Sequence, residues 1–277
     1  MRKTFSGIIL DSMAFNRLLL TGAAGGLGKV LRQRMKPWAR TLRVSDREPL
    51  EAGAANEEVV VCDLADREST YKLVHGTDAI VHFGGISVET RFDAILQSNI
   101  VGAYNIYEGA RRHAVKRVVF ASSNHVTGFY QQSERIDAEA PMRPDGLYGV
   151  SKCFGENLSR FYFDRYGIET VCLRIGSSFP APRDRRMLST FLSYDDLTEL
   201  VRVSLFTPQV GHTVIFGMSD NADKWWDNAK AAHLGYRPQD SSEPWRAALE
   251  AKQPALDPKE PVVRFQGGGF VVKGPYE

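Results

Sequence analysis

Tyr148 and Lys152 are four residues apart, a spacing that places both side chains on one face of a helix. A tyrosine with its ordinary pKa of about 10 is a poor base at neutral pH. A nearby ammonium group favours the phenolate, so we expect Lys152 to lower the pKa of Tyr148. The hydroxyl of Ser123 can hydrogen-bond the same substrate oxygen that Tyr148 deprotonates. The three side chains therefore predict general-base chemistry on a substrate hydroxyl.

Ser123 belongs to the polar run SSNH at 122–125, which directly follows an apolar strand expected at 116–121. Polar residues at the carboxyl end of a buried strand are typical of an active site in a parallel sheet. A Tyr-x-x-x-Lys spacing by itself also occurs on many solvent-exposed helices. It gains weight here because it follows a glycine-rich turn, four strands and this serine-containing strand end, in that order.

The glycine-rich turn is the segment TGAAGGLG at 21–28, between a short apolar strand and an expected helix. A strand that runs through glycines into a helix is typical of a dinucleotide-binding turn, in which the helix N-terminus holds the phosphates. Gly22 permits the turn, Gly25 lets the backbone approach a pyrophosphate, and Gly28 lets the helix pack on the strand. An ordinary glycine-rich loop is the alternative. The predicted cofactor contacts in this turn are Gly22, Gly25, Gly26, Leu27 and Gly28.

Asp46 ends the second expected strand and follows Gly28 by about the 20 residues that separate such a turn from the acid on the adenosine ribose. Because a carboxylate there repels a 2'-phosphate, NAD is favoured over NADP as the cofactor. Arg43 and Arg47 weaken that preference slightly.

The remaining apolar segments alternate between strands and helices. Strands are expected at 18–20, 41–45, 58–62, 79–83, 116–121 and 171–175, and helices at 27–35, 67–75, 92–112 and 148–166. This alternation predicts an α/β fold with a Rossmann-type, doubly wound parallel sheet, whose ligands lie at the carboxyl ends of the strands. Asp63 and Leu64 follow the third strand and Gly84 the fourth, so we expect all three beside the cofactor. Asp63 could equally cap the helix that follows.

Asn99 falls inside the long helix expected at 92–112, where asparagine is mildly unfavourable. Its side chain must either face solvent or serve the site, and we favour the second interpretation.

Taken in this order, the motifs resemble those of the extended short-chain dehydrogenase/reductase family. The resemblance covers about residues 14–180 and rests on the glycine turn, Asp46, Asp63-Leu64, Asn99, Ser122-Ser123 and the Tyr148-x-x-x-Lys152 pair. In that family the serine, tyrosine and lysine are catalytic, and the asparagine supports a proton relay to the lysine. The resemblance therefore implies catalytic roles for Ser123, Tyr148, Lys152 and Asn99, with Tyr148 and Lys152 also contacting NAD.

The length of the chain after the sixth strand bears on the substrate. Only about a hundred residues follow it, fewer than in family members that hold nucleotide-linked sugars, so we expect a small substrate. Segments 83–87, 122–125 and 177–186 look most like family members that oxidise C1 of D-galacturonate or D-glucuronate with NAD, giving an aldarolactone. A small-sugar epimerase, another sugar dehydrogenase or a non-catalytic dinucleotide sensor are the alternatives. Such sensors commonly lack the tyrosine and lysine that this chain retains.

This resemblance also implies a set of substrate contacts. The residues concerned are Ser87, Ser123, Asn124, His125, Tyr148, Ser177 and Arg186. Arg186 would bind the C6 carboxylate, because a guanidinium forms a bidentate fork on such a group. The three arginines between 183 and 186 could instead form a solvated basic loop, and His125 could have a structural role.

Composition narrows the class of protein and of partner. The 277 residues are 43% hydrophobic and 25% charged with a net charge of +2, which is typical of a globular protein without a nucleic-acid-binding surface. Three cysteines fall in no disulfide or metal pattern, so we expect no metal and a cytoplasmic location. No apolar run is long enough to span a membrane. The expected partner is a small acidic sugar.

The chain is expected to divide into three parts. Residues 1–12 would be an extension without a functional role, 13–175 an NAD-binding Rossmann core, and 176–277 a small substrate lobe and tail. The lobe is expected to contain helices at 194–206 and 223–233 and a strand at 212–216. A tail rich in proline and glycine beyond residue 254 would wrap the surface or contact another subunit. By analogy with the family, we expect a homo-oligomer formed through the helices at 92–112 and 148–166.

Overall fold

A seven-stranded sheet organises the chain in the computed structural model, which describes residues 15–254, 257–274 and 276. The strands run in the order β3-β2-β1-β4-β5-β7-β8, and all the pairs are parallel. They are β1 (Phe15–Thr21), β2 (Ala39–Asp46), β3 (Glu57–Val61), β4 (Ala79–His82), β5 (Arg117–Ser123), β7 (Glu169–Ile175) and β8 (His212–Gly217). The predicted doubly wound parallel sheet is confirmed. The predicted extension at 1–12 lies outside the described residues.

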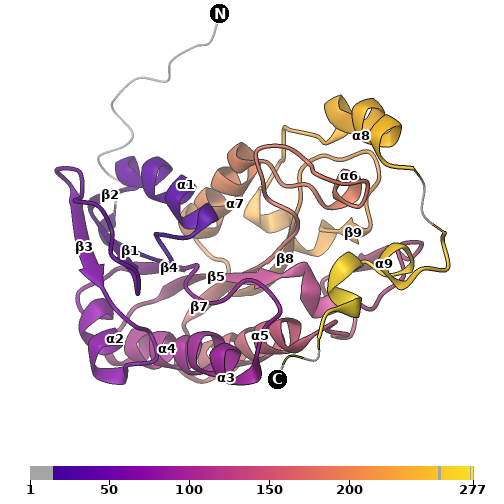
Figure 1. Cartoon of the computed structure of the whole chain (residues 1–277). Helices are drawn as coiled ribbons and strands as arrows, with labels where there is room; N and C mark the ends of the chain where they lie inside the picture. Colours follow the sequence, from indigo (N-terminus) through magenta and orange to yellow (C-terminus); the bar gives the residue numbers. More distant parts are fainter. Residues whose placement is uncertain (1–14, 255–256, 275, 277) are drawn as a thin grey trace, which may run out of the picture.

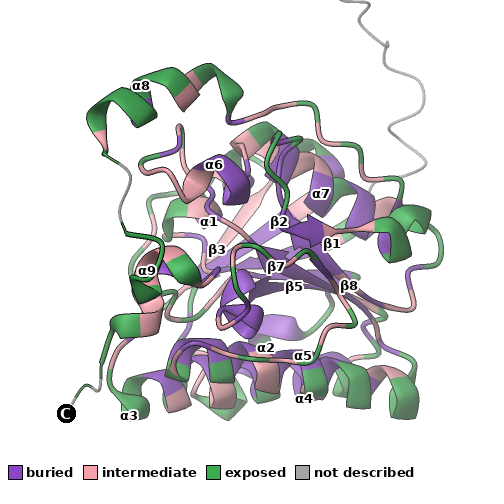
Figure 2. Ribbon diagram, turned by 90° about the vertical axis from the view of Figure 1, so that its right-hand side faces the viewer, coloured by how far each residue is buried: buried purple, intermediate pink, exposed green. Residues whose placement is uncertain are grey.

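Helices cover both faces of the sheet (Figure 1). One layer contains α2 (Arg67–Val74), α4 (Gly102–Arg112) and α5 (Leu147–Tyr166), and the other contains α1 (Gly26–Arg34) and α7 (Tyr194–Phe206). Successive residues of β1 therefore enter two different cores: Leu18 and Leu20 pack under α1 and α7, and Leu19 packs on the opposite face. Burial on both faces explains why the strands read as continuous apolar runs. Figure 2 shows the strands buried between the two helical layers.

The helix expected at 92–112 has an unusual middle. It consists of α3 (Phe92–Ile95), a π-helical segment η2 (Leu96–Val101) and α4. The single regular helix that we predicted is therefore wrong in its centre. Asn99 is buried in this π-helical segment. Such segments are rare and often lie at functional sites, because they turn a side chain out of the regular helical register.

The helix expected at 223–233 is also wrong. Here β9 (Trp226–Asp227) pairs with β6 (Ile136–Asp137), and a 3₁₀ helix, η4 (Ala229–Leu234), follows. Trp226 is fully buried and stacks on Phe216 with 4.9 Å between ring centroids. Tertiary packing of this indole decides the local backbone. The helix at 194–206 and the strand at 212–216 are confirmed as α7 and β8, so the chain beyond residue 175 also completes the sheet and one helical layer.

An outer layer of short elements lies beyond the carboxyl ends of the strands (Figure 1). Its helices are α6 (Met187–Thr190), α8 (Arg246–Lys252), α9 (Pro261–Arg264) and η6 (Gly268–Val272), and the remaining short helices are η1 (Lys36–Trp38), η3 (Asn124–Thr127) and η5 (Glu243–Trp245). The C-terminal segment returns to the 128–132 loop, where the N–H of Gly267 donates to Gly128 O (2.8 Å). None of the helices in the described ranges is long and apolar enough to cross a membrane.

Candidate active site

The glycine turn after β1 has the tight geometry that its sequence predicted. Gly22 has a φ of +75°, and a Cβ atom there would collide with the carbonyl of Phe83. A Cβ atom at Gly28 would collide with the carbonyl of Gly22, so helix α1 lies directly against the turn. Both positions therefore require glycine, for conformation at Gly22 and for close packing at Gly28.

The N-terminus of α1 is open to a ligand. The helix begins at Gly26 and Leu27, its N-cap Gly25 provides no side-chain cap, and its first turn holds no acidic residue. The first N–H groups of an α-helix have no partner within the helix. Together with the positive end of the helix dipole, they form a site for a phosphate group.

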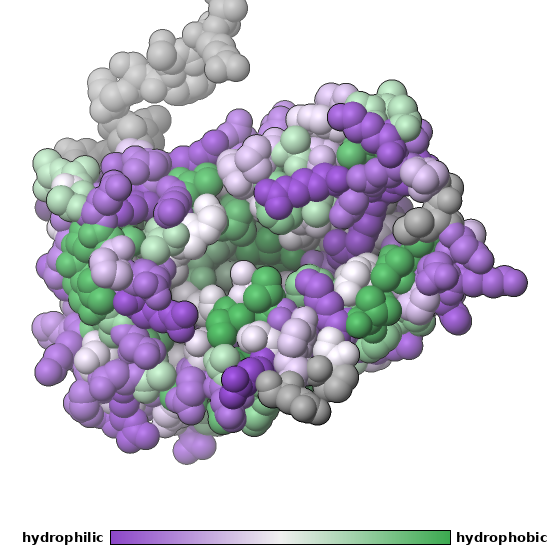
Figure 3. Space-filling view, viewed as in Figure 1, coloured by the Kyte–Doolittle hydropathy of each residue, from purple (hydrophilic) through white to green (hydrophobic). Residues whose placement is uncertain are grey.

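A cleft runs from this turn across the carboxyl ends of β1 to β4, and Figure 3 shows a hollow in this face of the molecule. Its lining includes Gly22, Gly25, Asp46, Asp63, Leu64 and Gly84. Asp46 also stabilises the turn, because its Oδ2 accepts from the N–H of Ala24 (2.9 Å). Asp63 does not cap α2, since that position belongs to Asp66, which accepts from the N–H of Ser69 (2.7 Å).

Of the two arginines near Asp46, Arg47 belongs to the lining of the cleft and Arg43 does not. Arg43 is buried against Glu58, with 2.9 Å between Nε and Oε2, and donates to the carbonyl of Leu73. Arg47 lines the cleft but is exposed and lies next to Glu48. The carboxylate of Asp46 is thus the charged group that the turn itself holds in place.

Thr21 and His82 form a support that the sequence analysis did not anticipate. The Thr21 hydroxyl lies 2.8 Å from His82 Nδ1 and accepts from the N–H of Gly84 (3.1 Å). Complete burial lowers the pKa of His82 to about 3, so the imidazole is neutral. This pair fixes the backbone of Gly84 at the floor of the cleft. In the sequence, the only pointer to this support was Thr21, a hydroxyl residue at the end of the first strand.

Ser123, Tyr148 and Lys152 come together as predicted. Ser123 ends β5, Tyr148 and Lys152 lie in the first two turns of α5, and all three are buried. The side chain of Ser123 lies close enough to that of Tyr148 to favour its phenolate form. The Lys152 ammonium donates to the carbonyl of Ala121 (2.7 Å) and lies 5.7 Å from the centre of the Tyr148 ring.

The sequence predicts that Lys152 lowers the pKa of Tyr148, and this lowering is not found in the structure. Burial raises the pKa of Tyr148 to about 12, against a smaller lowering by Ser123. Burial also lowers the pKa of Lys152 to about 8, and among the described residues no carboxylate forms an ion pair with the ammonium. The lysine is directed to a backbone carbonyl rather than to the phenol oxygen.

Asn99 is buried, as expected for a residue that serves the site, but its side chain has a specific partner. Its Oδ1 accepts from the N–H of Ile86 (2.7 Å), and its Nδ2 donates to the carbonyl of Ile86 (3.0 Å) and to Ser151 Oγ (2.9 Å). Asn99 therefore anchors the loop after β4 to helix α5. The proton relay to Lys152 stays a prediction.

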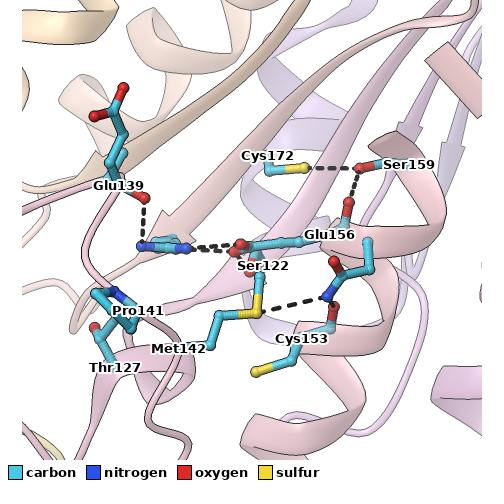
Figure 4. Close-up of polar contacts among 12 residues, drawn as sticks. Ser122, Thr127, Glu139, Pro141, Met142, Cys153, Glu156, Ser159 and Cys172 are labelled. Atoms are coloured by element: carbon cyan, nitrogen blue, oxygen red, sulfur yellow. Dashed lines mark hydrogen bonds and ion pairs between the residues drawn. The ribbon is translucent and has the colours of Figure 1, made fainter. Parts of the chain in front are cut away.

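A buried ion pair supports the strand end that carries Ser123. Arg174 forms two hydrogen bonds to Glu156 (3.0 and 2.8 Å), and both side chains are 2% exposed. Glu156 also accepts from the hydroxyl of Ser122 at 2.5 Å (Figure 4). Since Glu156 lies on α5 one turn after Lys152, this pair links β5 and β7 to that helix.

Of the three clustered arginines, Arg186 is the one directed to the site. Its Nε donates to the carbonyl of Gln266 (2.6 Å) and its Nη1 to Ser177 Oγ (3.3 Å). With the Asn124 amide oriented to satisfy both of its neighbours, Nη2 donates to the Asn124 oxygen (2.8 Å). No carboxylate of the described residues forms an ion pair with Arg186. Arg183 is exposed and stacks on Phe179.

His125 is buried between helix α5 and the C-terminal segment. Its Nδ1 lies 2.7 Å from Asp145 Oδ2, and its ring stacks on Phe270 at 3.8 Å. Burial lowers the pKa of His125, partly offset by Asp145. A carboxylate can only accept, so Nδ1 carries the hydrogen and Nε2 is left as an acceptor. Ser87, by contrast, is exposed on the loop after β4.

Phe270 and Gln266 were missed by the sequence analysis. The tail carries no motif, and only its return across the sheet edge brings these residues to His125 and Arg186. Gln266 is fully buried and accepts from Trp226 Nε1 (2.9 Å), which fixes the carbonyl that Arg186 contacts. In the described part of the chain, no cluster of three or more His, Cys, Asp or Glu residues could hold a metal ion.

Comparison with known proteins identifies the family. Residues 18–194 match the model described as the NAD dependent epimerase/dehydratase family. The chain is 61% identical over 268 residues to a uronate dehydrogenase of Pseudomonas putida, covering 96% of this chain and 100% of the relative.

Two solved structures extend this similarity to the fold. The crystal structure of uronate dehydrogenase from Agrobacterium tumefaciens has a TM-score of 0.92 at 51% identity, covering 95% of this chain and 98% of that one. A mutant of that enzyme complexed with NAD gives a TM-score of 0.91 at 51% identity, covering 94% and 98%. The resemblance drawn from the motifs is thus confirmed. The chain belongs to the NAD dependent epimerase/dehydratase family, in the branch that contains the uronate dehydrogenases.

Proposed function

We propose that the protein oxidises C1 of a hexuronate, D-galacturonate or D-glucuronate, with NAD as the hydride acceptor, and releases an aldarolactone. The observation that carries this proposal is Arg186, a largely enclosed guanidinium without a carboxylate partner among the described residues. Its neighbour Asn124 directly follows Ser123 in the chain. A sugar carboxylate supplies the charge that this arginine lacks.

The cofactor site fits NAD. The glycine turn and the uncapped α1 N-terminus suit a pyrophosphate, and Asp46 suits an unphosphorylated adenosine ribose. When bound, NAD accepts the hydride at its nicotinamide, and the positive charge of that ring lowers the pKa of neighbouring acids such as a tyrosine.

Tyr148 would act as the base. As the phenolate, it removes the proton of the C1 hydroxyl, while Ser123 hydrogen-bonds the same oxygen. The C1–H bond breaks with both electrons leaving as hydride, and the C1–O bond becomes a carbonyl, so that the cyclic sugar becomes a lactone. Lys152 lies one helical turn after Tyr148. As an ammonium, it would offset the negative charge of the Tyr148 phenolate.

Substrate selection follows from charge. A guanidinium bound to a carboxylate adds charge-assisted hydrogen bonds that a neutral sugar cannot form, worth about 1.5–3 kcal/mol each. Ser87, Asn124, His125 and Ser177 would hydrogen-bond the ring hydroxyls. His125 Nε2, as an acceptor, suits a hydroxyl donor.

We further propose that the enzyme is a cytoplasmic homo-oligomer. Helices α3, α4 and α5, the helical layer at the bottom of Figure 2, expose large apolar side chains, among them Phe92 (50%), Tyr104 (41%), Val150 (47%) and Phe161 (45%). A second copy packed on this face would cover them. The three cysteines are free, as a reducing compartment requires. Sedimentation analysis of the protein, with Phe161→Glu as a variant that weakens such an interface, tests the assembly.

The test of the activity is NADH formation from NAD with galacturonate or glucuronate, with galactose and glucose as neutral controls. We expect NADH with the uronates and little with the neutral sugars. Tyr148→Phe should lower kcat by about 10³-fold, since it removes the general base. If no NADH forms from either uronate, the proposal is wrong, and a screen of other small sugars decides between another dehydrogenase and an epimerase of this family.

A further inference from the structure

The loop at 83–89, between β4 and α3, connects the two halves of the site. It begins at the cofactor cleft with Gly84 and contains Ser87, one of the proposed substrate contacts. Asn99 holds both backbone polar groups of Ile86 in the middle of this loop. The end of the loop is held by a second side chain, Glu89.

Glu89 caps the catalytic helix from a distant part of the chain. Its carboxylate accepts from the N–H of Leu147 and from the N–H of Tyr148, both at 2.9 Å, which are the first two residues of α5. The local N-cap residue, Gly146, has no side chain to do this, and a Cβ atom there would collide with the Glu89 carboxylate. Glu89 is 8% exposed, so water is a poor substitute for it.

The chemistry of the contact requires a carboxylate. Two N–H donors need two acceptor oxygens, which a carboxylate supplies. A glutamine supplies one acceptor, and its NH₂ group would face the second N–H. An anion at a helix N-terminus also interacts favourably with the helix dipole.

We propose that Glu89 is a positioning residue for the reaction: it holds the backbone of the catalytic Tyr148 in a fixed relation to the loop that carries Ser87. Through Glu89 and Asn99 the loop is tied to α5 at both ends of its first turn, because Asn99 also contacts Ser151. Base and substrate-binding loop then move as one unit. The kinetic part of this role rests on the proposed function.

The test compares Glu89→Ala and Glu89→Gln with Ser193→Ala as a matched control. Ser193 caps α7, a helix without any proposed site residue, by accepting from the N–H of Asp196 (3.0 Å). Glu89→Ala and Ser193→Ala lose a helix cap and Glu89→Gln loses one of its two acceptors, so all three should lower the melting temperature by up to a few degrees. Only the Glu89 variants should alter catalysis.

For Glu89→Ala we expect kcat to fall by about 10- to 100-fold and KM for the uronate to rise, since the base and Ser87 lose their alignment. The isotope effect on kcat with substrate deuterated at C1 should increase, because hydride transfer becomes slower relative to product release. Glu89→Gln should retain an intermediate kcat, since one acceptor oxygen remains. NAD affinity should change little, as the glycine turn is untouched.

Hydrogen exchange provides a readout that does not depend on activity. In Glu89→Ala, amides in both 84–89 and 147–150 should exchange faster than in the wild type, while those of α7 should not. If the wild type makes no NADH from uronates, the proposed function fails and exchange alone decides the role of Glu89. Unchanged exchange in both segments, or kinetics of the Glu89 variants equal to those of Ser193→Ala, would overturn the positioning role.

Discussion

The cofactor cleft and the substrate side of this site are built in opposite ways. The cleft lies on the first four strands, and its lining falls between Thr21 and Ser98. The substrate side draws on segments from Ser87 to Phe270, brought together by the sheet edge and the returning tail. The cofactor cleft is formed mainly by backbone and glycines that are close in the sequence. The substrate side is formed by side chains from distant parts of the chain.

The two regions also use charge differently. The cleft offers N–H groups and a helix dipole, with one carboxylate held by the turn. The proposed substrate side contains the buried ionisable groups Lys152 and His125 with Asp145, and the half-buried Arg186. Buried charges lose hydration, so each must be compensated by a neighbour or by a ligand. This is why we propose a charged ligand for the substrate side.

Gly22→Ala should disrupt the cofactor cleft and leave the substrate side intact. We expect it to have the largest effect of the changes considered. The positive φ costs roughly 1–3 kcal/mol for a residue with a Cβ, and the collision with the Phe83 carbonyl adds to it. We expect a loss of at least about 3 kcal/mol in the free energy of unfolding, measured with urea, together with weaker NAD binding. Gly26→Ala is the control for stability, since a Cβ there meets nothing within 4 Å. Equal stability of the two variants would contradict the strain at Gly22.

Arg186→Ala should weaken binding of the uronate and leave the cofactor cleft intact. Loss of charge-assisted hydrogen bonds of about 1.5–3 kcal/mol corresponds to a KM for the uronate about 10- to 100-fold higher. The KM for NAD should stay unchanged. Arg183→Ala, which removes an exposed guanidinium three residues earlier, should leave both KM values as in the wild type. Equal losses in the two variants would mean that the basic loop acts as a whole.

Lys152 lies where the two regions meet. Its titration should have a smaller effect, which is a dependence of the free energy of unfolding on pH. Its pKa is about 8 in the folded protein, below the ordinary value of 10.5. Between these values the unfolded chain binds the extra proton, so stability should rise with pH. The slope reaches at most about 1.4 kcal/mol per pH unit. Above pH 10 the raised pKa of Tyr148 acts in the opposite direction.

Urea unfolding of wild type and Lys152→Met between pH 7.5 and about 10 measures this contribution as a difference. The wild type should gain stability relative to the variant as the pH rises. A constant difference would show that Lys152 keeps its ordinary pKa when folded.

The parts that could be predicted are those with local causes. Alternating apolar runs predicted the strands and the parallel, doubly wound sheet, and the turn at 21–28 predicted where α1 begins. The π-helical segment around Asn99 could not be predicted, because it is held by contacts with Ile86 and Ser151. The helix expected at 223–233 failed for the same reason, since Trp226 is held by Phe216 and Gln266.

By itself, the sequence determined the fold class, the glycine turn and the Tyr148-Lys152 pair, because strand burial, backbone sterics and helical spacing act between neighbouring residues. Only the tertiary structure decided which partners hold Arg186, that Phe270 stacks on His125 and how helix α5 is capped. Arg186, Phe270 and Glu89 owe their roles to partners 80, 145 and 59 positions away, which are Gln266, His125 and Tyr148. Such contacts depend on how whole elements pack, and no local pattern records them.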